Sequence, residues 1–514
     1  MDVLERGEIL LNKNQISQFI KQDMMSTKKK QAEIGLNYYE GKHDIINYRL
    51  FYYNDDGEAV EDTTRSNIKI SHPFFTELVD QQIQYMLSGK DGFVKSDIPE
   101  LQIELDNYFN DNEDFAAELY EVLTGAVVKG FEYMYAYKNK EDRLAFQCAD
   151  SMGVVEVRAK DTDDNCDYVI YWYVERLAKY DKKIKKIQVW DDKEVYYYMQ
   201  ENEGEIMEDD TVKINPRPHT LYKKGDSEDL YYENFGFIPF FRLDNCKKQF
   251  SGLKTIKELI DDYDLMSCGL SNNLQDATEY LVVVKGFEGD SLDELIQNTK
   301  TKKHIGVSDT GGIDYKTVDV PYEARKTKLE LDEKNIYRFG MGFNSAQIGD
   351  GNVTNVVIKS RYALLDLKCN KLEIRLKQFL RKILKVVLQE INNLNGTDYQ
   401  QKDVYFDFTR EIMTNALDNA QISQIETSTE GAKVNTLLNL QGIIDDETIL
   451  QNICDVLDID YESLEPIEDE ETEMLELEDE IDAIEPEDEQ GISDEEKATQ
   501  DAVLKMLDDL LKEV

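Results

Sequence analysis

The sequence is poor in the residues that usually carry metal and redox chemistry. Its 514 residues include only six cysteines and four histidines. The cysteines lie far apart without a CxxC pair, and no histidine has metal-ligand spacing to a cysteine. This pattern argues against the common zinc and thioredoxin-like motifs, and it predicts reduced, buried thiols and no metal.

Long apolar runs are also missing. Continuous apolar stretches are only a few residues long, such as "YLVVV" at 280–284, which is too short to cross a bilayer. The start "MDVLERGEIL" is acidic and has no apolar h-region, so we expect no signal peptide. These absences predict a protein with no membrane partner.

Motifs for catalysis are absent as well. No GxxxxGK[ST] phosphate loop, HExxH or GxSxG occurs, and "MLSGKDG" lacks the first glycine and the hydroxyl of a phosphate loop. The stretch from Asp161 to Asp167, "DTDDNCD", could hold a cation, but without the EF-hand glycine and glutamate a plain turn is favoured. We therefore predict no enzyme and no cofactor.

Positive charge is scarce. The chain has 106 acidic and 59 basic residues, a formal net charge of -47. Such a surface repels nucleic acid, although it could still handle DNA that must not bind tightly. From residue 461 onward the sequence has 23 acidic and 3 basic residues, which predicts a solvated acidic tail.

What is present predicts an α+β fold that is mostly helical. Apolar periodicity indicates helices over 15–45, from Pro73 to Gly89, and over 113–130, and the first of them carries a basic patch at Lys28, Lys29 and Lys30. "FYYNDDGEAV" predicts a hairpin with an Asp-Gly turn. From about 131 to 242, short aromatic and β-branched segments predict an antiparallel meander or open barrel.

The second half begins with a predicted amphipathic helix over 253–281, whose polar face carries Asp261, Asp262, Asp264 and Asp276. A compact α/β insert follows, with strand "YLVVVKGF", helix "SLDELIQN", strand "HIGVS", a "DTGG" turn and strand "DYKTVDV". Pro321 then opens another helix that runs to about 338.

The longest predicted helix runs from Val353 to Asn395 without glycine or proline, which is roughly 60 Å at the usual rise per residue. Its polar face is mostly basic, which suggests ion pairing with a neighbouring acidic surface; a simply solvated face is the alternative. The interface candidates are Arg375, Lys377, Arg381 and Lys382. A "DVYFDFTR" strand and short helices over 417–460 follow.

A neutral, glycine-rich stretch, "FGMGFNSAQIGDGNVTN" at 339–355, separates these two helices. In this setting the order of elements resembles the portal proteins of tailed bacteriophages, of the siphovirus type. "NIKISHPFFTELVDQQIQYMLSGK" resembles the family's helix with a Tyr-x-x-x-Gly ending, here Tyr85 and Gly89. The helix–loop–long-helix at 321–395 is a second similarity. A third is "NFGFIPFFRLDNCKKQFSGLKTIKELIDDYDLMSCGLSNNLQD", with matches at Ile238, Pro239, Phe240, Asn245, Ser251, Leu259, Ile260, Asp261, Tyr263, Ser267 and Asn273.

The resemblance covers roughly residues 20 to 460, and Cys246 departs from it where family members often have a second asparagine. It implies an elongated subunit in a ring, usually of twelve, at one vertex of the capsid, with double-stranded DNA passing through the channel. Implied partners are the terminase large subunit, a head-to-tail adaptor, and the major capsid and scaffolding proteins. The implied location is the virion, and the host cytoplasm during assembly.

The resemblance also implies a division of the chain. The expected regions are a wing at 1–250, a stem helix at 251–280, a clip at 281–320, a second stem helix at 321–339, a channel loop at 340–356, a long wing helix and returning strand at 357–410, crown helices at 411–460 and the acidic tail at 461–514. The stem acids Asp261, Asp262, Asp264 and Asp276 are then expected to line the channel.

The channel loop is expected to approach the DNA. Amide and hydroxyl groups exchange hydrogen bonds with phosphates without the salt-dependent affinity of cations, and glycines let the loop change shape. The expected DNA-facing residues are Asn344, Ser345, Gln347, Gly349, Asp350, Gly351, Asn352, Thr354 and Asn355. Two alternatives stay open: the loop is a plain connector between helices, or the chain is an acidic DNA mimic that binds basic partners.

Overall fold

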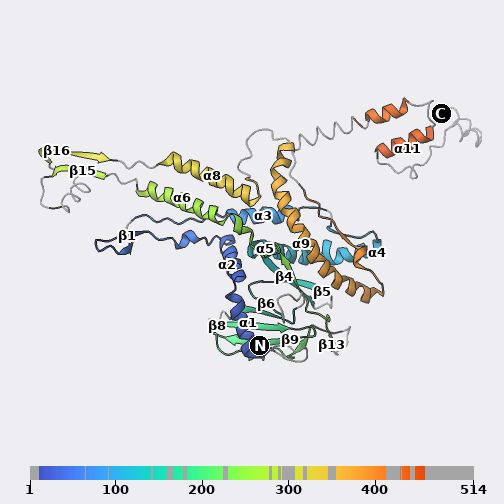
Figure 1. Cartoon of the computed structure of the whole chain (residues 1–514). Helices are drawn as coiled ribbons and strands as arrows, with labels where there is room; N and C mark the ends of the chain where they lie inside the picture. Colours follow the sequence, from blue (N-terminus) through green and yellow to red (C-terminus); the bar gives the residue numbers. More distant parts are fainter. Residues whose placement is uncertain are drawn as a thin grey trace, which may run out of the picture. The chain divides into compact units, whose positions relative to one another are not determined.

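The computed structural model describes most of the first four hundred residues and short parts of the rest. The described residues are 11–63, 65–90, 92–139, 143–158, 166–177, 182–223, 230–276, 281–287, 291, 307–316, 321–344, 355–411, 429, 431–439 and 446–457. Helices and antiparallel strands alternate along the chain (Figure 1), which confirms a mixed α+β fold. The chain divides into two compact units, 1–415 and 416–514.

The first unit begins with two helices, α1 (Lys13–Met24) and α2 (Thr27–Tyr39). The sequence predicted one continuous helix over 15–45, which is wrong. Ser26 has extended backbone geometry, and its hydroxyl accepts a hydrogen bond from the Lys29 amide at 3.2 Å. A serine that caps a new helix in this way interrupts the old one.

A helical core follows, built from α3 (Phe74–Met86), α4 (Pro99–Leu105) with the π-helical turn η2 (Asp106–Asn110), α5 (Glu113–Lys129) and α9 (Asn355–Asn395). Asn112 caps α5 at its start, and Gly130, with φ of 96°, ends it. The fully buried side chains of this core include Leu78, Ile83, Leu123, Leu376 and Ile383.

Two separate antiparallel sheets replace the single predicted meander. In the first, the strand order is β14–β4–β5, with β4 (Phe131–Lys138), β5 (Leu144–Ala149) and β14 (Phe240–Asp244). In the second, β6 (Val154–Val157), β7 (Tyr168–Leu177), β8 (Lys182–Trp190) and β9 (Glu194–Glu201) pair in order. Short strands β10 (Met207–Glu208) and β11 (Arg217–Pro218) also pair with β9, while β12 (Thr220–Lys223) and β13 (Leu230–Glu233) form a hairpin.

Helix α1 covers one face of the second sheet. Ile16 and Ile20 of α1 are buried with Val155, Ile170 and Ile187 in one apolar cluster. The strand positions of the predicted meander are thus confirmed, but its sheet is split between β5 and β6, which belong to different sheets, and β14 returns from later in the chain to pair with the other edge of β4.

The next part holds two helices side by side, α6 (Lys257–Asp276, after the turn η3, Gly252–Thr255) and α8 (Tyr322–Gly340). A hairpin of β15 (Leu281–Phe287) and β16 (Val307–Lys316) lies between them in sequence. The predicted "DTGG" turn falls inside strand β16, at a break in its register where Ser308 to Gly311 face the single residue Gly286 of β15. Of the predicted helix "SLDELIQN" only Ser291 lies among the described residues.

Smaller elements complete the described chain. The hairpin of β1 (Phe51–Tyr53) and β2 (Ala59–Glu61) is confirmed, and it follows the turn η1 (Asp44–Asn47). The predicted "DVYFDFTR" strand shrinks to β17 (Tyr405–Phe406), which follows η6 (Gln401–Asp403) and pairs with β3 (Val94–Lys95). In the second unit, residues 431–438 are helical, and α11 (Asp446–Leu457) follows them. No helix in the described ranges is long and apolar enough to span a membrane.

Candidate functional site

Polar contacts hold α6 and α8 together. The Lys328 ammonium of α8 lies 2.5 Å from a carboxylate oxygen of Asp262 in α6, and it also bonds to Asp332 one turn further along α8. Burial opposes the charge of Lys328, but the hydrogen bonds to Asp262 and Asp332 outweigh it and raise the pKa of this lysine. Gly269 lets α8 approach, since a Cβ there would lie 2.8 Å from a guanidinium nitrogen of Arg325.

The base of α6 is fixed by a buried carboxylate between two imidazoles. Asp264 has 0% exposure; one carboxylate oxygen lies 2.6 Å from Nδ1 of His43 and the other 2.7 Å from Nδ1 of His72. The His72 amide also donates to Asp264 at 3.0 Å. Burial by itself would raise the pKa of Asp264, but the hydrogen bonds from both histidines lower it below its usual value.

The other predicted stem acids also have partners within the subunit. Asp261 accepts hydrogen bonds from the Tyr38 hydroxyl and, at 2.7 Å, from the Lys257 ammonium. Asp276 accepts a hydrogen bond from the Ser66 hydroxyl at 2.6 Å. Asp261 and Asp262 are half-buried and Asp276 is exposed, so these three can still present charge to a surface. The expectation does not hold for Asp264, whose carboxylate is enclosed by its histidine partners.

The glycines at the end of α8 serve packing. A Cβ on Gly340 would lie 2.6 Å from a methyl carbon of Leu78 in α3, and one on Gly342 would lie 2.3 Å from the other. Between them, Met341 adopts the left-handed conformation with φ of 56° and ends the helix. Only a residue without a side chain allows α3 and this turn to approach so closely.

The turn after α8 is held at a second point. The Gln81 side chain donates to the Phe343 carbonyl at 2.9 Å and accepts from the Phe343 amide at 3.3 Å, and the Asn344 side chain donates to Glu333. The start of the predicted channel loop is therefore anchored to α3 and α8. Of its DNA-facing candidates, Ser345, Gln347, Gly349, Asp350, Gly351, Asn352 and Thr354 lie outside the described residues, as does the side chain of Asn355.

The predicted basic face of α9 is present, but its four interface candidates differ. Lys377 pairs with Glu373 in the same helix at 2.8 Å, and the Arg381 guanidinium lies 5.8 Å from the centre of the Phe406 ring. Arg375 bonds only to the neutral side chain of Gln378 at 3.4 Å. Lys382 is exposed and has no ion pair within the described part of the chain.

Lys382 borders a cavity of about 1760 Å³ between α9, α2 and the two sheets. Lys385 and Lys28 also line it, and aromatic side chains such as Phe237 and Phe240 form part of its wall. Asp23, Glu156, Asp192 and Asp244 line it as well, so the cavity combines charges of both signs with apolar surface. In the described ranges no group of three or more histidine, cysteine or acidic side chains could hold a metal ion. Of the candidate cation site from Asp161 to Asp167, only Cys166 and Asp167 lie inside these ranges.

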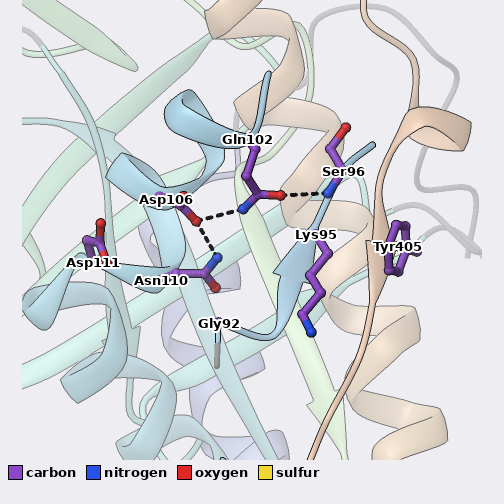
Figure 2. A pocket seen from close by; sticks show the side chains of 8 residues that line it. All are labelled: Gly92, Lys95, Ser96, Gln102, Asp106, Asn110, Asp111 and Tyr405. Carbon is purple, nitrogen blue, oxygen red and sulfur yellow. Dashed lines mark hydrogen bonds between the residues drawn. The ribbon is translucent and has the colours of Figure 1, made fainter. Parts of the chain in front are cut away.

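A smaller polar cavity of about 390 Å³ lies beside β3 and η2 (Figure 2). Figure 2 shows its amide side chains turned toward one another: Gln102 and Asn110 both donate to Asp106, at 2.7 and 2.6 Å. Asn110 also pairs with both backbone groups of Val94, and Gln102 accepts from the Ser96 amide at 2.6 Å. These side chains satisfy one another's hydrogen-bonding groups and those of the β3 backbone. We therefore interpret them as a structural support for β3.

Sequence reasoning missed the partners of two largely enclosed cations, Lys29 and Arg410, since such contacts have no periodic signal. Arg410 pairs with Asp366 at 2.6 Å and with Glu373, and so ties the chain after β17 to α9. Lys29, predicted as part of a basic surface patch, is 2% exposed. It donates to the Ser151 carbonyl and, at 2.9 Å, to the Val154 carbonyl, joining α2 to the second sheet.

Comparison with known proteins gives consistent matches over most of the chain. A family model described as phage portal protein, SPP1 Gp6-like, matches residues 18–487. The chain is similar to the portal protein of Bacillus phage SPP1, with 26% identity over 385 residues, 74% of each chain. It is also similar to the portal protein of Clostridium phage phiCD119, with 24% identity over 408 residues, 75% of this chain and 84% of the relative.

Proposed function

Since the chain belongs to the SPP1 Gp6-like family of phage portal proteins, we propose that its copies form a ring around a channel for double-stranded DNA, with α6 and α8 as the stem helices. Portal proteins are structural components of the phage capsid, and this chain acts as one. In the proposed ring, residues 1–250 and 357–410 form the wing, 281–320 the clip and 411–460 the crown. The terminase motor and then the adaptor dock on this ring.

The single observation that carries the assignment of the channel loop is the anchored turn at Gly342 and Phe343. This turn ends α8 and fixes the point from which the ten residues between Asn344 and Asn355 lead to the start of α9. The proposed DNA-facing residues within it, from Ser345 to Thr354, include no lysine or arginine. A loop without cations adds no salt-dependent affinity for the phosphates, so the duplex can slide past it.

The stem acids support the same principle. Asp276 is exposed, and Asp261 and Asp262 are partly exposed, so we propose that each keeps enough open surface to add negative charge to the channel. Negative charge next to a duplex lowers its affinity for the wall. Asp264 has a structural role and is not part of this surface.

For contacts between neighbouring subunits, we assign Arg375 and Lys382 of α9. Within the described residues neither has an ion pair, whereas Lys377 and Arg381 already have partners in their own subunit. Unpaired cations on a long rigid helix suit an acidic surface on the next copy, and the chain as a whole is strongly acidic.

The experiment that tests the function has two steps. First, light scattering and negative-stain imaging of the purified protein should give a hollow ring, of about 0.7 MDa if it holds twelve subunits of 59.7 kDa. A monomer would contradict the ring and favour the acidic DNA mimic.

Second, deletion of residues 345–352 should leave rings intact, because the anchors at Gly342 and Phe343 remain, but should reduce DNA packaging or retention. The control replaces the same residues with a glycine–serine segment of equal length. Normal packaging and retention by the deletion variant would show that the loop has no role in the channel.

A further inference from the structure

The hairpin of β1 and β2 forms a projecting arm, defined here as residues 48–62. Arg49 holds Glu61 across the two strands with contacts of 2.8 and 3.0 Å. In the turn, the Asn54 side chain accepts from the amides of Asp56 and Glu58 at 3.1 and 2.8 Å, and Gly57 supplies the positive φ of 79°. The arm is thus locally well defined.

Its apolar side chains are nevertheless uncovered. Tyr53 is 79% exposed, Phe51 56%, Tyr52 48% and Val60 36%, and every residue of both strands is exposed. Because neighbouring residues of a strand point to opposite faces, both faces of the hairpin are open. An isolated two-stranded hairpin is marginally stable in water, and a contiguous exposed apolar patch marks an interaction site.

The arm is fastened to the stem. Residues that follow it run along one face of α6, where the Ile68 amide donates to Asn272 at 2.7 Å and the Ser66 hydroxyl donates to Asp276. Helix α8 packs on a different face of α6, through Asp262 and Gly269. In Figure 1 the hairpin and α8 accordingly lie on opposite flanks of α6.

The outer face of α8 offers chemistry that complements the arm. Leu331, 53% exposed, lies on one face with the exposed Lys334 and Arg338, at spacings of three and seven residues, and Phe339 is 52% exposed. Within the described residues neither cation has an ion pair. The tip of the arm carries three exposed acids without ion pairs in that part of the chain, Asp55, Asp56 and Glu58.

We propose that the arm of one subunit docks on the outer face of α8 in the next subunit of the ring, with its aromatic side chains covering Leu331 and Phe339 and its acidic tip facing Lys334 and Arg338. This inference rests on the proposed ring. Because the arm and the α8 face are different surfaces on two flanks of α6, the contact is head-to-tail, the type that closes into rings. Within one subunit α6 separates the two surfaces.

Cross-linking tests the contact. The variant with Tyr53→Cys and Leu331→Cys, treated with a short bifunctional maleimide, should give a ladder of covalent dimers and higher species from the ring fraction. The unaltered chain, with its six cysteines, sets the background. The control pairs Tyr53→Cys with Ile103→Cys, an equally open site on α4 at 65% exposure, and should stay at background. A ring fraction that gives no ladder above that control overturns the docking proposal.

Charge exchange provides a second test that distinguishes this proposal from the proposed function. Changing Asp55, Asp56 and Glu58 to lysine, or Lys334 and Arg338 to glutamate, should each lower the ring fraction several-fold at low salt, and combining both sets should restore it. If the arm variant alone and the α8 variant alone both form rings as well as the unaltered chain does, the arm contact is overturned but the proposed ring is not. If the unaltered chain forms no ring, the proposed function itself fails.

Discussion

The core around α9 and the α6–α8 pair are both helical, but different forces hold them. Helix α9 buries an almost continuous apolar stripe from Leu365 to Ile391. Helix α6 buries only Ile260, Asp264 and Cys268, and α8 buries Asp332 among its few inward residues. Burial of apolar area is not directional, whereas hydrogen bonds and ion pairs demand particular atoms. The placement of α6 against α8 therefore depends on a few side chains, and the packing of the core on many.

The sharpest test of this contrast is Asp264→Ala. Removing the carboxylate leaves His43 and His72 without their acceptor inside the fold, and breaking a buried pair in this way costs about 3–5 kcal/mol. We expect this loss in urea denaturation of the purified protein at fixed concentration. Asp262→Ala, at a site that is 40% exposed, is the control and should cost much less. Equal effects would mean that burial of Asp264 does not matter.

The same carboxylate predicts a dependence on pH. The pKa of Asp264 is lower in the folded protein than its usual value of 3.8. Its contribution is therefore complete above pH 3.8 and is lost as the pH falls through the lower folded value. Asp264→Asn should flatten this part of the acid denaturation curve. If the variant loses stability with falling pH as steeply as the unaltered protein does, other carboxyl groups are responsible for the acid sensitivity.

In the core, Leu376→Ala should have a somewhat smaller effect. Leu376 is 0% exposed and lies in the main apolar cluster, so its truncation leaves a cavity and costs about 3 kcal/mol, within the usual range of such changes. Urea denaturation again measures it. Leu367→Ala on the same helix is the matched control, since that side chain is 58% exposed and should lose almost nothing.

This contrast also explains what the sequence could predict. The α9 helix was predicted to within two residues at its start, because spacings of three and four apolar residues persist over ten turns. Strands β4 to β9 were found from short aromatic and β-branched segments, and the β1–β2 hairpin from its Asp-Gly turn. The break between α1 and α2 was missed, because a serine cap is one side chain within a polar stretch.

No periodic pattern in the sequence predicted contacts between residues that lie far apart in the chain. Asp264 looked like one more acid on a polar helix face, and only folding brings His43 and His72 to it, 221 and 192 residues away in the chain. Lys29 looked like a surface lysine for the same reason. Asp309 to Gly312 looked like a turn from composition, and the structure places them inside β16, where the register with β15 breaks between Gly312 and Val307.

Gly342 tests whether close packing or flexibility explains the glycines after α8. Gly342→Ala places a Cβ 2.3 Å from a methyl carbon of Leu78, so we expect a loss of about 1–3 kcal/mol from overpacking. The double variant Gly342→Ala with Leu78→Ala should recover part of the cost of the glycine change, which a double-mutant cycle would measure. Additive effects would remove Leu78 as the reason for glycine here.

The smallest effect on the folded subunit is expected for Lys382→Glu. Its side chain is exposed, with no ion pair among the described residues, so its stability should change by no more than about 0.5 kcal/mol. Assembly should nevertheless weaken at low salt, most clearly together with Arg375→Glu, because charge reversal at an interface places like charges together. Lys213→Glu, an exposed lysine away from α9, is the control for net charge. Equal ring fractions for all three variants at low salt would show that the basic face of α9 is only solvated, whereas a loss confined to the α9 variants would place it between subunits.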